Sequence, residues 1–185
     1  MLKDAYKEAE ARMKAAVQSL EAELGGIRTG RASPALVERL HVDYYDTPTP
    51  LIQLASISVP ESRSLVIRPF DATSLKAIER AILASDLGLT PNNDGKVIRL
   101  NLPTLTEDRR RELVKLVHHR TEDSRVAMRN IRRDLIKDLR EFEEEKLISK
   151  DDLKEGEEEL QIITDRYIEE VNIASLRKEK EIMEV

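Results

Sequence analysis

Three stretches of the chain repeat apolar residues at alternating spacings of three and four residues, and this pattern requires long helices. The stretches span residues 2–27, 106–145 and 153–182. Apolar residues at this spacing lie on one face of a helix, and a single helix with such a face is not stable alone in water. We therefore predict that the three helices cover one another's apolar faces in a three-helix bundle.

Residues at the ends of these stretches support the assignment. Thr106 can cap the second helix through its hydroxyl group. Ser149 and Asp152 stand three residues apart just before the third stretch, a close relative of the capping box. The glycine pair at 25–26 weakens the last turns of the first helix. Gly156 stands near the apolar face of the third helix, where it would allow another helix to approach closely.

The pattern changes to short strands between residues 36 and 103. Strands are predicted at 41–45, 52–59, 65–68 and 97–102, with turns at 46–50 and 91–95. A short helix follows Asp71 or Ser74, either of which could cap it, and it stops near Gly88. These elements predict a small β/α/β domain inserted between the first and second long helices. The predicted fold class is therefore α+β.

The chain passes twice between the two predicted domains, and both passages suit a hinge. We assign residues 1–29 and 106–185 to the bundle and residues 32–103 to the inserted domain. Gly30 permits unusual backbone angles, whereas Pro34 and Pro103 restrict theirs. A two-stranded connection of this kind is a candidate hinge, although a rigid elbow is equally compatible with the sequence. The predicted hinge residues are Thr29, Gly30, Arg31, Pro103, Thr104 and Leu105.

Charge is strongly segregated along the second long helix. Residues 109–133 contain nine Lys/Arg and three Asp/Glu, a net charge of +6, whereas residues 134–185 have a net charge of −9 and the whole chain only −5. Like charges four residues apart on a helix repel each other. Arg125, Arg129 and Arg133 nevertheless follow one another at that spacing, and Arg132 lies beside them. We name these four arginines the basic ridge, and we expect a polyanion-binding surface rather than a merely solvated one.

The scarcity of aromatic residues limits the kind of polyanion contact. Phe, Trp and Tyr make up only 3% of the chain, which argues against binding of single strands by base stacking. A nucleic-acid partner would therefore be contacted at its phosphates and recognised by its shape. Binding of that kind depends strongly on salt concentration.

The sequence lacks the residue patterns of common enzyme and metal sites. It contains no cysteine, and the three histidines, His41, His118 and His119, are not spaced for metal binding with carboxylate partners. The glycine-rich stretch at 25–32 lacks the Gly-Lys-Ser/Thr ending of a phosphate-binding loop. No Gly-x-Ser-x-Gly motif occurs. We therefore predict a protein that is not an enzyme, with no catalytic residue, no metal and no cofactor.

The composition also predicts where the protein works. Charged residues begin at Lys3, and no apolar run approaches the length of a membrane span. We expect a soluble cytoplasmic protein with no membrane partner.

Four stretches of the sequence carry a resemblance to a known family. They are IRTGRASP at 27–34, YYDTPTPL at 44–51, ASDLGL at 84–89, and LTE at 105–107 followed by RR at 109–110 and RNIRR at 129–133. In this order and at these distances they resemble the bacterial ribosome recycling factors over essentially the whole chain. The resemblance implies a three-helix bundle with an inserted β/α/β domain, in an L shape similar to transfer RNA.

The resemblance also implies a function and its partners. Members of this family bind the ribosome after termination and, with elongation factor G and GTP, split its subunits, so that messenger RNA and deacylated transfer RNA are released. GTP hydrolysis belongs to the partner, in agreement with the missing phosphate loop. We expect a monomer that docks on large-subunit ribosomal RNA near the intersubunit face.

The same resemblance selects the binding residues. Arg129, Arg132 and Arg133 match the family's binding arginines, with Arg28 as a nearby contributor from the first helix. Arg125 and Arg31 are added on the same argument. The hinge would let the partner push the smaller domain while the bundle stays anchored.

Two other classes of protein stay open. One is a helical adaptor that binds only proteins, with the basic ridge facing an acidic surface; weak salt dependence and no affinity for ribosomal RNA would favour it. The other is an enzyme with an unrecognised site in the α/β domain. Its signature would be a deep pocket with convergent polar groups and perturbed ionisation.

Overall fold

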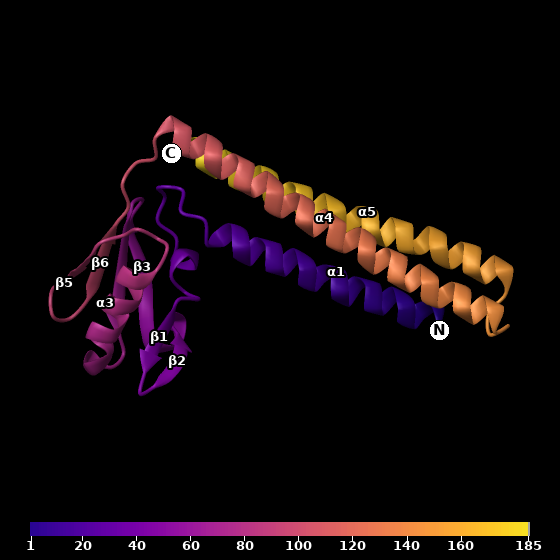
Figure 1. The fold of residues 1–185 in the computed structure, drawn as a ribbon, viewed down its shortest axis with the longest axis horizontal. Coiled ribbons are helices and arrows are strands. Elements are labelled where there is room, and N and C mark those ends of the chain that lie inside the picture. The colour runs from indigo at the N-terminus through magenta and orange to yellow at the C-terminus, as the bar shows by residue number, and fades with distance from the viewer. Residues whose placement is uncertain (185) are drawn as a thin grey trace. The chain divides into compact units, whose positions relative to one another are not determined.

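The computed structural model describes residues 1–184, so the last residue of the predicted bundle range, Val185, lies outside the described residues. The chain forms two compact units. The first unit consists of Met1–Leu24 and Val114–Lys180, and the second consists of Gly25–Leu113 with the residues from Glu181 onward. The element order along the chain can be followed in Figure 1.

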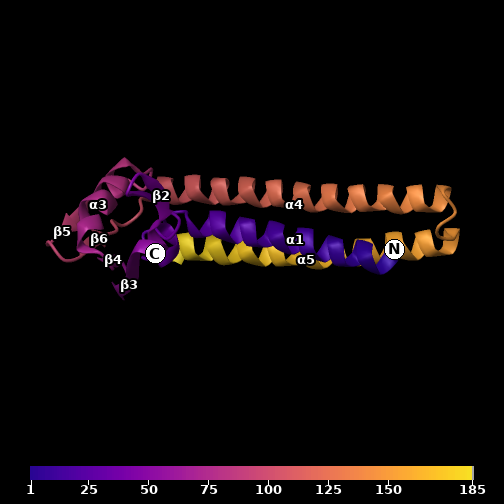
Figure 2. The same ribbon diagram turned by 90° about the horizontal axis from the view of Figure 1, so that it is seen from below.

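Three long helices supply the first unit: α1 (Leu2–Gly25), α4 (Glu107–Glu144) and α5 (Lys150–Glu184). Gly25, the first seven residues of α4 and the last four of α5 fall in the second unit. In Figure 1, α4 and α5 overlap while α1 lies apart; in Figure 2, turned by 90°, α1 and α5 overlap while α4 lies apart. The helices therefore form a triangle in cross-section. Their apolar faces meet in a core that includes Ala9, Met13, Val17 and Leu20 of α1, Val117, Met128, Leu135 and Leu139 of α4, and Leu160, Ile163, Tyr167 and Val171 of α5.

The predicted caps of α4 and α5 are confirmed. The Thr106 hydroxyl accepts a hydrogen bond of 3.2 Å from the backbone N–H of Arg109. At the start of α5, the Ser149 hydroxyl accepts from the Asp152 N–H at 3.1 Å, and the Asp152 carboxylate accepts from the Ser149 N–H at 2.9 Å. This reciprocal pair is the capping box predicted from the spacing, and it satisfies two N–H groups near the helix start.

The end of α1 differs from the prediction. The helix was expected to reach Ile27, but it ends at Gly25. Two consecutive glycines lose more conformational freedom in a helix than other residues do, so the last turn is not maintained. Arg28, expected on this helix, therefore lies in the coil that follows it.

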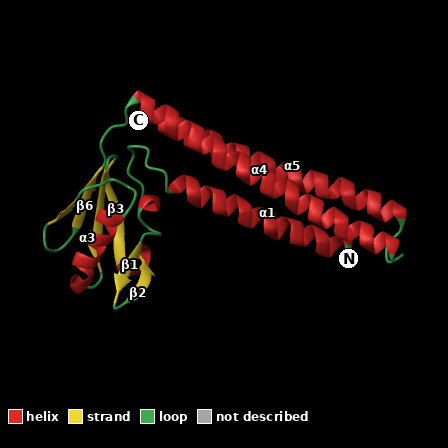
Figure 3. Ribbon diagram, in the orientation of Figure 1, coloured by secondary structure: helices red, strands yellow, loops and turns green. Residues whose placement is uncertain are grey.

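An antiparallel sheet forms the centre of the second unit, with strand order β3-β4-β6-β5. The strands are β3 (Ala55–Glu61), β4 (Ser64–Pro69), β5 (Pro91–Asn93) and β6 (Ile98–Asn101). A separate hairpin pairs β1 (His41–Tyr44) with β2 (Thr47–Pro50). Figure 3 shows the sheet and hairpin in yellow and the helices in red. The helices of this unit are α2 (Leu51–Leu54) and α3 (Leu75–Ala84), with single 3₁₀ turns at Pro34–Leu36 and Ala72–Ser74.

The second unit has its own apolar core. Leu65 and Ile67 of β4, Ile98 of β6, and Ile78 and Ile82 of α3 are fully buried in it. The fold class predicted from the sequence, α+β with long helices and a small sheet domain, is confirmed.

Three local predictions in this unit are wrong. Residues 52–54 were expected in a strand, but they belong to the helical turn α2, and β3 begins at Ala55. A short apolar run does not distinguish a strand from a helical turn by its spacing. The expected turns at 46–50 and 91–95 contain β2 and β5. Each of these strands has a single neighbour, and proline is tolerated on such edge strands.

Candidate nucleic-acid interface

Two arginines of the basic ridge lie along the side of α4 that borders α5. The Arg125 guanidinium donates to the Asn172 side-chain oxygen from Nε at 3.0 Å and from Nη2 at 2.6 Å. Arg132 donates from Nη1 to the side-chain oxygen of Gln161. Since Asn172 and Gln161 belong to α5, these contacts fix two ridge arginines at the edge between the two helices.

The same edge continues in both directions. Arg140 contacts Glu157 of α5 at 2.8 Å, and His118 contacts Glu179 of α5 at 2.8 Å. α4 contacts α1 through a different side, where Arg120 pairs with Glu23 of α1 at 3.6 Å. Arg125 and Arg132 thus lie on a side of α4 other than the one that contacts α1.

One carboxylate lies within the ridge. Glu122 accepts hydrogen bonds from Arg125 at 3.2 Å and from Arg129 at 2.8 Å. No acid stands on the line of arginines spaced four apart. Glu122, however, is three residues before Arg125 and seven before Arg129, and residues at these spacings lie on the same helix face. The hydrogen bonds from Arg129 and then Arg125 lower the pKa of Glu122 below its ordinary value, so this side chain is ionised at neutral pH.

Arg133 differs from the other three ridge arginines. It is exposed, and no hydrogen bond or ion pair joins it to another part of the chain that the structure describes. A guanidinium presents five N–H donors, and a free one can grip a phosphate with two of them. Arg133 is therefore fully available to a ligand, Arg129 and Arg132 are partly available, and Arg125 has all three nitrogens engaged.

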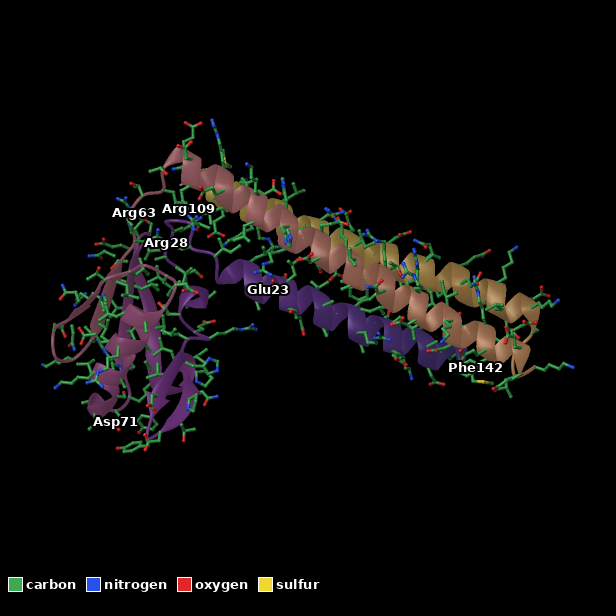
Figure 4. The ribbon with its side chains drawn as sticks, viewed as in Figure 1. Glu23, Arg28, Arg63, Asp71, Arg109 and Phe142 are labelled. Carbon is green, nitrogen blue, oxygen red and sulfur yellow. The ribbon has the colours of Figure 1, made fainter. Side chains whose placement is uncertain are left out.

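The remaining predicted arginines belong to the second unit. Arg28 is half-buried and Arg31 is exposed, both in the coil between α1 and the 3₁₀ turn at Pro34–Leu36. Figure 4 labels Arg28 in this coil and Glu23 on α1. The four ridge arginines thus form one group on α4, and Arg28 and Arg31 form a second group elsewhere in the chain.

The predicted hinge residues include buried and exposed positions. Thr29 is buried, and its hydroxyl donates to a Glu181 carboxylate oxygen at 2.8 Å. Gly30 has a φ of 80°, a value that glycine adopts at no steric cost. On the returning segment Pro103 and Thr104 are exposed and Leu105 is buried. Arg31 and Thr104 line an open pocket of about 550 Å³ with Ser62, Arg63 and Glu184.

Three residues of the site were missed from the sequence: Glu122, Gln161 and Asn172. Each holds a ridge arginine. Gln161 and Asn172 recur at helical spacing with Glu157 and Glu179 on α5, and this polar stripe beside the apolar face was a usable signal. Pairing it with the ridge required the relative register of α4 and α5, which packing determines.

The described residues bear on two other kinds of function. Within residues 1–184 no group of three or more His, Cys, Asp or Glu side chains is arranged to hold a metal ion. No helix in this range is both long and apolar enough to cross a membrane.

Comparison with known proteins gives matches over the length of the chain. Residues 20–183 match the family model described as ribosome recycling factor. The ribosome-recycling factor of Roseiflexus castenholzii is 55% identical over 185 residues, which cover 100% of both chains.

Solved structures give the same picture. A solution structure of ribosome recycling factor has a TM-score of 0.79 and 49% identity, covering 100% of this chain and 98% of its own. Models for the T. thermophilus ribosome recycling factor and E. coli elongation factor G bound to the E. coli post-termination complex match with a TM-score of 0.70 and 44% identity, covering 98% of each chain.

Proposed function

The chain belongs to the ribosome recycling factor family, and we propose that it recycles ribosomes after termination. It binds the post-termination ribosome and, with elongation factor G and GTP, splits the subunits, so that messenger RNA and deacylated transfer RNA are released. The observation that carries this proposal is the full-length similarity to a recycling factor placed with elongation factor G on the post-termination complex.

The basic ridge supplies the docking surface in this proposal. Arg129, Arg132 and Arg133 contact phosphates of large-subunit ribosomal RNA near the intersubunit face, and Arg28 and Arg31 contribute from the second unit. The availability of the guanidinium groups supports this assignment, because Arg133 has no described partner and Arg132 keeps nitrogen atoms free. Contacts with phosphates fix position and orientation without reading base sequence.

The inserted domain, at residues 32–103, and the bundle, at 1–29 and 106–185, have separate tasks in this mechanism. The bundle stays anchored while elongation factor G pushes the inserted domain about the hinge at 29–32 and 103–106. That motion strains the contacts between the ribosomal subunits. The nucleotide chemistry belongs to the GTPase: this chain acts in the cytoplasm as a monomer and catalyses no reaction of its own.

Light scattering tests the proposal directly. Post-termination ribosomes are mixed with this protein, elongation factor G and GTP, and a fall in scattering that requires all three components is expected. Arg132→Ala should weaken ribosome binding and slow the fall. Arg120→Ala is a matched control, because it removes the same charge from the side of α4 that faces α1.

Other outcomes would contradict the proposal. Tight ribosome binding without any fall in scattering would leave a docking protein with no role in splitting. An absence of ribosome binding, or binding that does not depend on salt, would favour the adaptor that binds only proteins. Equal effects of Arg132→Ala and Arg120→Ala would remove the basic ridge from the interface.

A further inference from the structure

A carboxylate of α4, Glu122, is bonded to two arginines of the basic ridge. The Glu122 carboxylate contacts both arginines, each through a different oxygen. Oε1 lies 2.8 Å from an Arg129 nitrogen, and Oε2 lies 3.2 Å from an Arg125 nitrogen. The side chains are 53%, 43% and 34% exposed in the order Glu122, Arg129, Arg125. A ligand from solution can therefore reach this cluster.

A carboxylate and a phosphate compete for the same donors. Both present oxygen atoms to the planar guanidinium, and both form charge-assisted hydrogen bonds with it. A phosphate that approaches Arg129 meets a negative charge already bound there. It must displace Glu122 or share the arginine with it, and either event lowers the affinity of the ridge for a polyanion.

The other acids of this helix segment do not have this position. Asp123 follows Glu122 directly, but it contacts His119 at 3.1 Å and none of the four ridge arginines. Glu112 contacts Arg109, outside the ridge. Removal of charge at Glu122 therefore changes the ridge itself, whereas removal at Asp123 changes the charge of the helix and the contact with His119 but leaves the ridge contacts in place.

We propose that Glu122 is a built-in anionic competitor that keeps the docking of the basic ridge reversible. It occupies Arg129 and Arg125 in the free protein and returns to them when the RNA leaves, which limits affinity and speeds release. This inference rests on the proposed function, because a recycling factor must leave the ribosome before it can act on the next one.

The test is ribosome binding by Glu122→Gln at a series of salt concentrations. Glutamine keeps the shape of the side chain and removes its charge. We expect the dissociation constant to fall by roughly twofold to fivefold, the range of an exposed ion pair. The slope of log affinity against log salt should become steeper by up to about one, because the positive charge of Arg129 is then no longer offset by the Glu122 carboxylate. Asp123→Asn, with the same change in net charge, should change both quantities much less.

Repeating the Glu122→Gln substitution in a protein that already carries Arg129→Ala shows whether the tighter binding depends on Arg129. In Arg129→Ala the gain from Glu122→Gln should largely disappear, because the arginine that the carboxylate occupies is absent. An equal gain in both backgrounds would mean that Glu122 acts only through general charge, and this would overturn the inference. Weaker binding by Glu122→Gln would also overturn it, since the carboxylate would then orient the arginines for RNA.

The outcomes separate this inference from the proposed function. If Arg132→Ala weakens ribosome binding but Glu122→Gln does not tighten it, the ridge is the interface and only the competitor is rejected. If neither variant changes binding, the ridge is not the docking surface and the competitor is rejected with it, whereas the recycling function is still decided by the light-scattering assay. When the factor is far less abundant than the ribosomes, each factor molecule must leave one ribosome before it acts on the next. Under this condition Glu122→Gln should split ribosomes more slowly per factor molecule. An unchanged rate would reject the role of Glu122 in release.

Discussion

At the scale of single residues, the arginines of the basic ridge differ in how many of their nitrogen atoms are already bonded. Arg125 has three engaged nitrogens, two of them on Asn172, whereas Arg133 has no described partner. Arg125 therefore joins α4 to α5, and the Arg133 guanidinium is free to bind a ligand. The two substitutions to alanine should have different consequences.

We expect Arg133→Ala to reduce the salt slope of ribosome binding by about one and to leave stability nearly unchanged. Arg125→Ala should lower the free energy of unfolding by about 1 kcal/mol, because its hydrogen bonds to Asn172 are lost. Its effect on the salt slope should be smaller. Urea unfolding and ribosome binding at several salt concentrations measure the two quantities. A larger loss of salt slope in Arg125→Ala than in Arg133→Ala would reverse the assignment.

The sequence predicts the arginines of the candidate site but not the residues that hold them. The spacing of Arg125, Arg129 and Arg133 is a local property of one helix, so it can be read directly. Gln161 and Asn172 lie 29 and 47 residues beyond their arginine partners. Their pairing depends on the register between two helices, and a single sequence does not contain that register in any local pattern.

A second residue-scale difference lies in the hairpin of β1 and β2. The expected turn began at Asp46, but the turn residues are Tyr45 and Asp46, with φ of 50° and 59°. Two successive residues with positive φ are typical of a two-residue hairpin turn in which Asn-Gly is preferred. Tyrosine is uncommon there. The local sequence therefore gave no signal for a tight hairpin at this point, and β2 was missed.

At the scale of elements, the long helices were predictable and several short elements were not. Each long helix repeats its pattern over many turns, and the caps at Thr106 and Ser149 mark two of the starts. A segment such as α2, with four residues, offers a single turn of pattern. Its conformation depends on contacts with the core of the second unit, in which Leu51 and Leu54 are buried.

The contact between α5 and its neighbours depends on Gly156. A Cβ atom at this position would lie 2.7 Å from Leu139 Cδ1 and 3.0 Å from Leu2 Cδ2, so a side chain must displace both leucines. Alanine would gain roughly 1 kcal/mol of helix propensity against this crowding. We therefore expect Gly156→Ala to be nearly neutral and Gly156→Val to lower the free energy of unfolding by about 1–3 kcal/mol.

Urea unfolding of the two variants tests this packing argument. Lys154→Val is the control, because Lys154 is an exposed residue of the same helix. Valine there should lower stability by only a few tenths of a kcal/mol, through its lower helix propensity. If Gly156→Val were no more destabilising than Lys154→Val, the close approach at Gly156 would contribute nothing to stability.

At the scale of the whole molecule, we expect the local charge of the basic ridge, and not the total charge, to govern docking. The chain has a net charge of −5, and yet the segment with the basic ridge carries +6 and the segment after it −9. If only the net charge of the whole chain mattered, a negatively charged protein would not be expected to bind a polyanion. Screening decides which charges the RNA experiences, because the Debye length at physiological salt is only about 8 Å.

The acids at the far end of α4 provide the test of this argument. Glu144 is 15 residues beyond Arg129 on the same helix, which at a rise of 1.5 Å per residue is about 22 Å. We therefore expect the double variant Glu144→Gln with Glu145→Gln to change ribosome affinity by less than about twofold at physiological salt. At 0.01 M salt, where the Debye length is about 30 Å, the same variant should bind measurably more tightly. Glu122→Gln removes a charge that lies within the ridge, so this variant should bind more tightly at both salt concentrations. If the double variant matched Glu122→Gln at physiological salt, the total charge would govern docking instead of the local field.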